Sequence, residues 1–281
     1  MSNTFAIGGD LEVRRLGFGA MRITGDGIWG PPDDPEEAKR LLRRVVDVGV
    51  NLIDTADSYG PEVSENLIAE ALHPYPDGLV IATKGGMRRS GPGKWPRDAR
   101  PERLKQCCED SLRRLKLERI DLYQLHAPDP KVPFEDSVGA LKELQDEGKI
   151  RHVGISNVSL EQLDQARGLV DVVTVQNRYN LTDRSSEHVL DACDEAGIGF
   201  IPWFPLAVGS LAEAGGALEE VAHAHDATPA QVALAWLLAR SPVMLPIPGT
   251  ASIEHFDENV EAVELTLTHE ERETIGRAAE G

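Results

Sequence analysis

Short apolar runs alternate with longer amphipathic stretches along most of this chain of 281 residues. The short runs have the length and composition of buried β-strands, whereas the longer stretches repeat their apolar positions with the period of a helix. Strands are expected over Leu16–Phe18, Asn51–Asp54, Leu79–Thr83, Leu122–His126, His152–Ser156, Val172–Gln176, Gly199–Trp203 and Met244–Ile247. Helices are expected over Pro35–Val48, Ser64–Leu72, Pro101–Leu115, Phe134–Glu147, Leu160–Arg167, Ser185–Ala196, 216–225, Gln231–Ala239, 253–262 and His269–Ala279. This alternation predicts an α/β fold with a parallel sheet that is covered by helices.

Eight parallel strands are the number that closes a (β/α)8 TIM barrel, and the chain length matches one such barrel. No linker rich in proline, glycine or serine interrupts the chain, so a single barrel domain over residues 1–281 is expected. The rival fold is an open doubly wound sheet, whose first strand normally leads through a glycine-rich phosphate fingerprint into the first helix. Here a long loop follows Gly17–Met21, which favours the barrel. Before the first strand, Phe5–Ile7 and Leu11–Val13 flank Gly8-Gly9-Asp10 and predict a β-hairpin.

Charge and cysteine content narrow the class of protein. The chain has 47 acidic and 29 basic residues and a net charge of −18, which opposes non-specific binding to nucleic acid or to anionic membranes. It has no apolar run long enough for a membrane span, and residues 1–10 lack the features of a secretory signal. The three cysteines follow neither a zinc pattern nor a disulfide framework. A cytoplasmic protein with reduced thiols, no metal site and no nucleic-acid or membrane partner is expected.

Four residues that could carry chemistry lie at or just beyond the C-terminal ends of predicted strands: Asp54, Tyr59, Lys84 and His126. In a barrel these strand ends meet at one mouth, so the four side chains can converge. Taken singly, each has a structural explanation, such as a loop cap, a solvated lysine or a packed core ring. Together they suit carbonyl reduction, because the alkoxide that forms needs a proton donor. A tyrosine serves if its pKa of about 10 is lowered, and a lysine about 4 Å away could supply up to about 4 kcal/mol at an effective dielectric near 20, before desolvation is subtracted.

The ten residues Asn51–Gly60 closely resemble the signature of the aldo-keto reductases, and the segments Gly154–Asn157 and Gly249–Asn259 extend this resemblance over nearly the whole chain. The resemblance implies a catalytic tetrad in which Tyr59 donates the proton. Asp54 would keep Lys84 charged and oriented, and a neutral His126 would hydrogen-bond the carbonyl oxygen. It also implies that the hairpin plugs the bottom of the barrel. The function implied is NADP(H)-dependent reduction of aldehydes or ketones to alcohols.

A nicotinamide cofactor is the second implication of the resemblance. Ser156, Asn157 and Gln176 match positions that hold the nicotinamide carboxamide, and their side chains can donate and accept hydrogen bonds. Trp203 stands where the family usually has an aromatic ring stacked on the nicotinamide, more often a tyrosine. The cofactor-binding residues implied are Gly19, Ala20, Met21, Asp54, Ser156, Asn157, Gln176, Trp203, Phe204, Pro205, Leu206, Ile247, Gly249, Thr250, Ser252, His255, Glu258 and Asn259.

The chain departs from the family pattern where the adenosine 2′-phosphate would lie. Gly249 and His255 stand where many members have lysine and arginine, so a bidentate arginine contact is lost. The hydroxyl groups of Thr250 and Ser252, the start of a helix and a partly protonated His255 still favour NADP(H). NAD(H), or use of both cofactors, remains open.

The substrate end carries fewer signals. The loop Ala207–Gly215 is brief and the chain stops soon after its last helix, so a wide, open pocket is expected, lined by Trp29, Trp95, His126 and the segment Ala127–Val132. The sequence indicates a small carbonyl substrate without identifying it, and the resemblance implies a monomer. Two alternatives remain: an NAD-dependent alcohol or sugar dehydrogenase, and a non-catalytic nucleotide-binding protein like the channel-associated β subunits. A barrel with metal-based chemistry is disfavoured, because no cluster of ligands has suitable spacing.

Overall fold

A curved parallel sheet forms the centre of the molecule in the computed structural model, which describes residues 3–206 and 216–279. Its strands pair in chain order, each parallel to the next. They are β3 (Phe18–Gly19), β4 (Leu52–Asp54), β5 (Val80–Gly85), β6 (Ile120–Leu125), β7 (Ile150–Ser156), β8 (Val172–Gln176) and β9 (Gly199–Phe200). Sequential parallel pairing brings every strand's C-terminal end to the same rim, which is the rim where the candidate residues lie.

The segment 243–248 closes this sheet into a barrel without forming a regular strand of its own. On one side, Leu245 N donates to Phe200 O at 2.8 Å. On the other side, Gly17 N donates to Pro246 O at 2.9 Å. Pro246 and Pro248 have no N–H group to donate, so the usual ladder cannot be completed. The predicted (β/α)8 barrel is therefore confirmed, and its eighth strand is a proline-interrupted segment that pairs on both sides.

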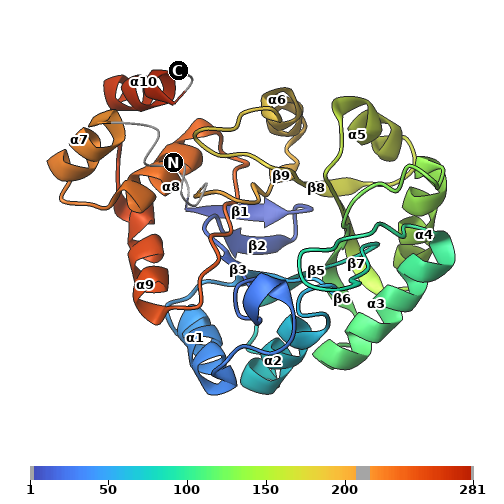
Figure 1. Cartoon of the computed structure of the whole chain (residues 1–281). Coiled ribbons are helices and arrows are strands. Elements are labelled where there is room, and N and C mark those ends of the chain that lie inside the picture. The colour runs from blue at the N-terminus through green and yellow to red at the C-terminus, as the bar shows by residue number, and fades with distance from the viewer. Residues whose placement is uncertain (1–2, 207–215, 280–281) are drawn as a thin grey trace.

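Helices surround the barrel in the order that the sequence predicts (Figure 1). They are α1 (Pro35–Asp47), α2 (Val63–Leu72), α3 (Pro101–Leu115), α4 (Phe134–Asp146), α5 (Leu160–Arg167), α6 (Glu187–Ala196), α7 (Gly216–Ala224), α8 (Pro229–Arg240), α9 (Ile253–Glu261) and α10 (His269–Ala278). Each lies within two residues of its predicted ends.

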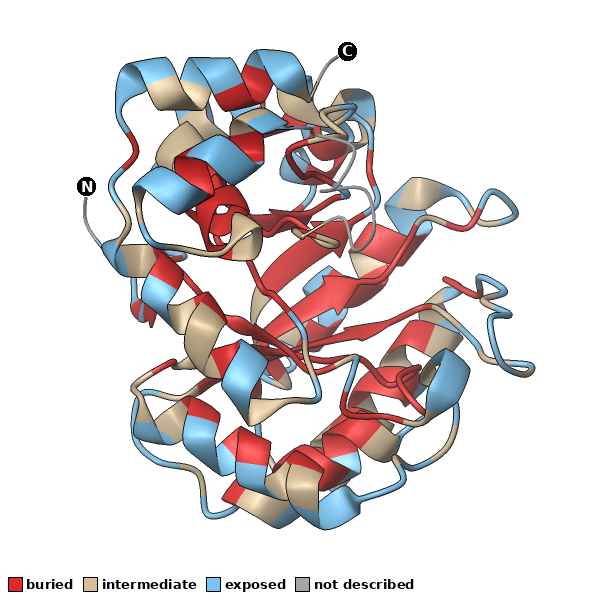
Figure 2. Ribbon diagram, turned by 60° about the vertical axis from the view of Figure 1, so that its left-hand side comes forward, coloured by how far each residue is buried: buried red, intermediate tan, exposed pale blue. Residues whose placement is uncertain are grey.

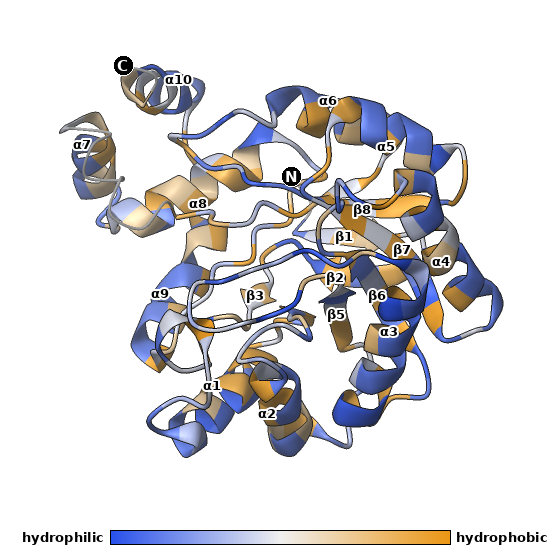
Figure 3. Ribbon diagram, turned by 45° about the vertical axis from the view of Figure 1, so that its right-hand side comes forward, coloured by the Kyte–Doolittle hydropathy of each residue, from blue (hydrophilic) through white to orange (hydrophobic). Residues whose placement is uncertain are grey.

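Helix α1 shows why these segments fold where they do. Pro35 occupies its first turn, and the Asp34 side chain caps it by accepting from Glu37 N at 2.9 Å. Leu41 and Val45 recur at helical spacing and are fully buried against the sheet. The same division holds around the barrel: buried positions face inward in Figure 2, and hydrophilic positions lie on the outer faces of the helices in Figure 3.

The N-terminal hairpin covers the bottom of the barrel, as expected. Strands β1 (Thr4–Ile7) and β2 (Leu11–Arg14) pair antiparallel around Gly8 and Gly9, both with positive φ. Ile7 and Val13 are completely buried. They pack in one apolar cluster with Leu52 and Val80, which open strands β4 and β5. The hairpin therefore seals the end of the barrel opposite the candidate site. Within the described ranges, no helix has the length and apolar character needed to cross a membrane.

Candidate active site

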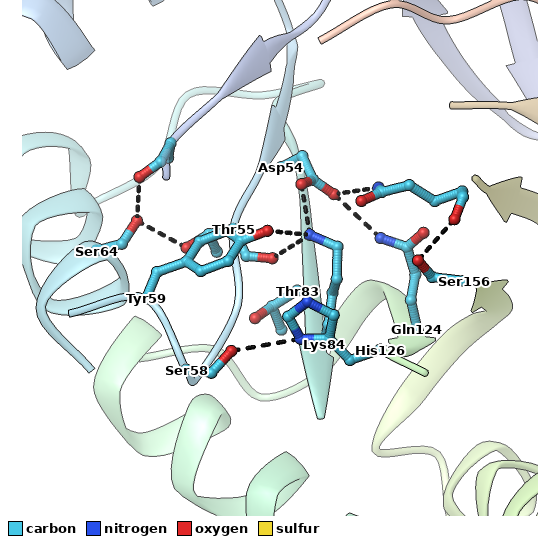
Figure 4. A network of polar contacts seen from close by, with 12 residues as sticks. Asp54, Thr55, Ser58, Tyr59, Ser64, Thr83, Lys84, Gln124, His126 and Ser156 are labelled. Atoms are coloured by element: carbon cyan, nitrogen blue, oxygen red, sulfur yellow. Dashed lines mark hydrogen bonds and ion pairs between the residues drawn. The ribbon is translucent and has the colours of Figure 1, made fainter. Parts of the chain in front are cut away.

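The four predicted tetrad residues lie close together at the rim formed by the C-terminal ends of the strands, and three neighbouring strands position them (Figure 4). Asp54 is the last residue of β4, Lys84 lies near the end of β5, and His126 follows β6 directly. Tyr59 comes from the turn between β4 and α2. All four side chains are buried, and Lys84 has no exposed surface at all. The structure therefore brings together all four residues that the sequence singled out.

Lys84 is the centre of this group. Its Nζ donates to Asp54 Oδ1 at 2.5 Å, to the Thr55 carbonyl oxygen at 2.9 Å and to Tyr59 Oη at 3.3 Å. These three contacts account for all three protons of an ammonium group. Burial by itself lowers the pKa of Lys84 and is the largest single influence, but the attraction and hydrogen bonds of Asp54 and Tyr59 together outweigh it, so the pKa is raised. Lys84 is therefore a buried cation that the site holds in its charged form.

The second oxygen of Asp54 ties the group to two further strands. Asp54 Oδ2 accepts from Gln176 Nε2 at 2.8 Å and from Gln124 Nε2 at 3.1 Å. A single carboxylate thus connects side chains from β4, β5, β6 and β8. Gln124 is a member of this network that the sequence analysis missed. Gln124 lies two residues before His126, and alternate residues of a strand point to the same side of the sheet, so this spacing could have indicated that Gln124 also faces the site.

Tyr59 differs from expectation in its pKa. Burial raises the pKa of this phenol, and the attraction of Lys84 opposes the rise without overcoming it. The expectation of a lowered pKa was wrong because the cost of desolvating a phenolate exceeds the gain from one neighbouring cation that already faces Asp54. The phenol consequently stays protonated at neutral pH, and it can still donate to an alkoxide, which is a stronger base than a phenolate. Its oxygen accepts from Lys84, which leaves its own proton free for another acceptor.

His126 is neutral, as predicted. Burial lowers its pKa well below the usual range, and the positive charge of Lys84 lowers it further. Its Nδ1 lies 3.3 Å from Ser58 Oγ, and its ring packs edge-to-face against Tyr59 with centroids 5.9 Å apart. If the Ser58 hydroxyl donates to Nδ1, the proton of the imidazole is carried by Nε2.

A cavity of about 420 Å³ opens beside the tetrad. Most residues predicted for the cofactor or substrate line it, namely Gly19, Met21, Asp54, Ser156, Asn157, Gln176, Trp203, Phe204, Pro205, Leu206, Ile247 and Gly249, together with Trp95 and His126. The sequence analysis missed five lining residues: Arg22, Ile28, Met87, Arg97 and Pro248. They come from loops whose course over the rim a strand-and-helix pattern does not specify.

Several predicted residues lie outside this lining. Trp29 pairs through its backbone with Gly60 and places its ring 5.6 Å from the Arg89 guanidinium, so its role in substrate binding stays a prediction. The predicted adenosine-side residues Thr250, Ser252, His255, Glu258 and Asn259, and Ala20 beside β3, also do not line the cavity. The brief loop predicted over Ala207–Gly215 lies outside the described residues.

The wall expected to hold a nicotinamide carboxamide is ordered by its own hydrogen bonds. Ser156 Oγ donates to Gln176 O at 2.6 Å, and Asn157 Nδ2 donates to His126 O at 2.9 Å. Asn157 Oδ1 accepts from Trp203 Nε1 at 3.0 Å, which fixes the indole ring at the cavity edge. Asn157 has φ of 59°, a left-handed conformation that asparagine tolerates better than most residues. Amide and hydroxyl groups beside an indole face fit the chemistry of a nicotinamide.

The segment expected to contact the adenosine end begins helix α9. Ser252 caps the helix by accepting from His255 N at 3.3 Å, and Thr250 Oγ1 accepts from Ser252 N at 3.0 Å. Both hydroxyl groups keep their own protons for donation. Arg22 lies beside this segment, since its Cγ is 3.6 Å from the position that a Cβ on Gly249 would occupy. A cation from the β3 loop therefore stands next to the glycine that replaces the family's usual basic residue.

No group of three or more histidine, cysteine, aspartate and glutamate side chains in the described part of the chain is arranged to hold a metal ion.

Comparisons with known proteins identify the family of the chain and agree with its fold. The model of the aldo/keto reductase family matches residues 15–280. An uncharacterized oxidoreductase of Schizosaccharomyces pombe is 51% identical over 262 residues, which cover 93% of this chain and 85% of that protein. Pyridoxine 4-dehydrogenase of Escherichia coli is 43% identical over 280 residues, which cover 98% of this chain and 97% of the enzyme. The crystal structure of an aldo-keto reductase from Klebsiella pneumoniae in complex with NADPH is 28% identical, has a TM-score of 0.83, and covers 99% of this chain and 95% of its own.

Proposed function

Because this chain belongs to the aldo/keto reductase family, we propose that it is an NADP(H)-dependent enzyme that reduces aldehydes or ketones to alcohols. The observation that carries the proposal is the contact series Asp54–Lys84–Tyr59 at the wall of the cavity, with Lys84 Nζ at 2.5 Å from Asp54 Oδ1 and 3.3 Å from Tyr59 Oη. It supplies a protonated phenol, a fixed cation beside it and a carboxylate that holds the cation in place.

The chain's residues would act on the carbonyl oxygen of the substrate. A reduced nicotinamide, when bound, supplies a hydride to the carbonyl carbon. Tyr59 transfers its phenolic proton to the oxygen as negative charge develops there, and the nearby Lys84 cation stabilises the phenolate left behind. His126 donates from Nε2 to the same oxygen and orients it. Hydride and proton together convert the carbonyl into an alcohol.

The cofactor would lie along the cavity wall described above. Ser156, Asn157 and Gln176 would bind the carboxamide, and Trp203 would pack on the nicotinamide ring. NADP(H) is favoured by the NADPH-bound relative and by Arg22, whose guanidinium can reach a phosphate near Gly249. If Arg22 has this role, Arg22→Gln lowers the ratio of NADPH to NADH affinity by about tenfold, the loss of one charge-assisted contact. An unchanged ratio would assign the phosphate contact to other groups.

The reverse reaction deserves the same test, because the Escherichia coli relative is named for the oxidation of an alcohol. The same residues serve both directions, with Tyr59 acting as the base in oxidation. An aromatic aldehyde or alcohol related to pyridoxine is accordingly the first physiological substrate class to try. The non-catalytic alternative is disfavoured by the complete tetrad, since a protein that only binds nucleotide has no need of a buried lysine beside a phenol.

Initial rates of NADPH and NADH oxidation with 4-nitrobenzaldehyde and pyridoxal test the proposal. Tyr59→Phe is expected to lower kcat by about 10²–10⁴, the usual contribution of a positioned proton donor, while NADPH affinity stays within twofold. Tyr75→Phe is the matched control, because among the described residues its hydroxyl bonds only the Leu115 carbonyl oxygen, away from the cavity. If the Tyr59 variant keeps a tenth or more of the wild-type rate, another group donates the proton. If the wild type binds nucleotide but turns over no aldehyde or alcohol, the reductase proposal fails.

A further inference from the structure

A second cavity, of about 520 Å³, lies beside the active site, and five of its ten lining residues are cationic. Its lining includes Arg88, Arg89, Arg97, Arg100 and Lys131. This concentration runs against the composition of the chain, which carries a net charge of −18. A surface patch would be expected to follow that acidic balance, so a local reversal of charge points to a ligand of negative charge.

The carboxylates in this wall do not cancel its cations. Asp98 accepts from Arg100 Nε at 2.7 Å and from Arg100 Nη2 at 2.9 Å, and Arg88 lies 3.6 Å away. One carboxylate is thus shared by two guanidinium groups. Asp129 instead accepts from the backbone N–H of Lys131 at 3.0 Å, and no lysine or arginine in the described residues forms an ion pair with it. Five cationic and two acidic side chains leave the wall with an excess of positive charge.

Two of the arginines have no carboxylate partner in the described part of the chain. Arg89 is held by main-chain carbonyl groups, including that of Ile28 at 2.6 Å, and lies 3.7 Å above the Trp95 ring. Among the described residues, the side chain of Arg97 makes one hydrogen bond, from Nη1 to the Pro128 carbonyl oxygen at 3.0 Å. Its remaining N–H groups are available to an anion.

Arg97 connects this charge to the chemistry, because it lines both cavities. The first cavity also contains Tyr59 and His126. Trp95 contacts residues of both cavities: its ring packs edge-to-face against Tyr59 at 6.3 Å and against His126 at 6.5 Å, and the guanidinium of Arg89, which lines the second cavity, lies 3.7 Å from the ring. A molecule whose carbonyl group reaches Tyr59 can therefore extend past Trp95 toward Arg97.

We propose that the substrates of this enzyme carry an anionic group, a carboxylate or a phosphate ester, which Arg97 and the adjoining cations bind while the carbonyl group lies between Tyr59 and His126. This inference rests on the proposed reductase function and specifies its substrate class. An arginine fork suits both anions, since each presents oxygen pairs that two N–H groups can contact. The overall negative charge repels such substrates at a distance, so the cationic wall would select them only at the cavity mouth.

Matched aldehyde pairs test the inference. The ratio of kcat/KM for 4-carboxybenzaldehyde to that for its neutral methyl ester measures preference for a carboxylate. The ratio for glyceraldehyde 3-phosphate to glyceraldehyde measures preference for a phosphate. We expect at least one ratio above one in the wild type, and Arg97→Gln is expected to lower it about fivefold, the effect of one partly exposed ion pair. Added salt should compress the same ratio.

Arg43→Gln is the control for net charge, because Arg43 is exposed on α1 and makes no ion pair within the described residues. Arg97→Lys keeps the positive charge but loses the two parallel N–H donors of the guanidinium, so it should retain part of the preference for anionic aldehydes. Ratios at or below one for both pairs, or equal ratios in Arg97→Gln and Arg43→Gln, would overturn the inference while leaving the reductase function intact.

If no aldehyde of either kind turns over, the reductase function itself fails. Titration calorimetry of 4-carboxybenzaldehyde against wild type and Arg97→Gln then decides separately whether the anion site exists: weaker binding to the variant supports it, and equal or absent binding refutes it.

Discussion

Replacing Asp54 by asparagine should destabilise the whole protein, because it leaves a buried cation without its counter-charge. At the observed 2.5 Å separation, the attraction between Asp54 and Lys84 amounts to about 7 kcal/mol at an effective dielectric of 20. Most of that energy offsets the cost of removing both charges from water. In Asp54→Asn the attraction is lost, but Lys84 remains fully buried. We expect the free energy of unfolding to fall by about 3–5 kcal/mol, the usual cost of breaking a buried pair on one side.

A double-mutant cycle makes this reasoning testable apart from catalysis. Lys84→Met alone leaves the Asp54 carboxylate, within the described residues, with only its two glutamine donors, and should also destabilise the protein. The double variant, Asp54→Asn with Lys84→Met, has no unpaired charge at this pair. Its loss in free energy of unfolding should therefore be smaller than the sum of the two single losses by about 2 kcal/mol or more. Urea denaturation followed by tryptophan fluorescence and by circular dichroism gives the three values. A cost below about 1 kcal/mol for Asp54→Asn, or simple additivity in the double variant, would refute the claim that this pair is strongly coupled.

Three further predictions concern pH and packing. Since burial raises the pKa of Tyr59, the initial rate of carbonyl reduction should stay constant across neutral pH. The rate of alcohol oxidation needs the phenolate and should rise steadily from pH 7 to 10, so a plateau of this rate below pH 8 would contradict the raised pKa. Burial, opposed in part by a hydrogen bond from Cys107, raises the pKa of Asp57 from 3.8 to about 7, so folding favours its protonated form and stability is lost as pH rises through this window. The free energy of unfolding of Asp57→Asn, relative to wild type, should therefore rise by up to about 4 kcal/mol from pH 4 to pH 8 in urea denaturation. A difference between the two proteins that does not change with pH would exclude the raised pKa of Asp57. A Cβ on Gly154 would lie 2.3 Å from Thr174 Oγ1, so Gly154→Ala should lower the free energy of unfolding by about 2–3 kcal/mol. Gly139 in α4 has open space around it, so Gly139→Ala should raise the free energy of unfolding by about 0.5–1 kcal/mol. Equal urea midpoints for the two variants would show that the β7–β8 packing can adapt.

The sequence was sufficient for the order of the elements and for the tetrad, because both depend on local pattern. Amphipathic spacing identified each α-helix of the described residues, and the strand ends identified Asp54, Lys84 and His126 without any contact information. Prolines explain the main disagreement in the fold. Met244–Ile247 has the apolar character of a strand, but the missing N–H of Pro246 prevents a regular ladder. The single-domain organisation over residues 1–281 and the monomeric state stay predictions.

The properties that the sequence could not supply depend on where loops cross the rim and on how deeply charges are buried. Arg22 and Arg97 come from loops without periodicity, so only the folded chain places them beside Gly249 and the tetrad. The pKa of Tyr59 was mispredicted for a related reason. The distance to Lys84 is close to the expected one, at 3.3 Å against about 4 Å, and desolvation was expected to oppose the lysine, but the residue types do not show that burial of the phenol is the larger effect. Pairwise electrostatics can be anticipated from residue types, whereas burial requires the structure.

The proline-interrupted segment 243–248 also determines what a partly folded chain would expose. Without it, the sheet has two free edges, one along β3 and one along β9, and each presents unpaired main-chain groups that other chains could join. Pairing of this segment with β9 on one side and with the start of β3 on the other covers both edges. The same segment carries Ile247, Pro248 and Gly249 into the wall of the reactive cavity. A molecule that has not closed therefore both lacks its binding site and risks aggregation, so resistance to self-association and competence to bind a ligand are acquired together.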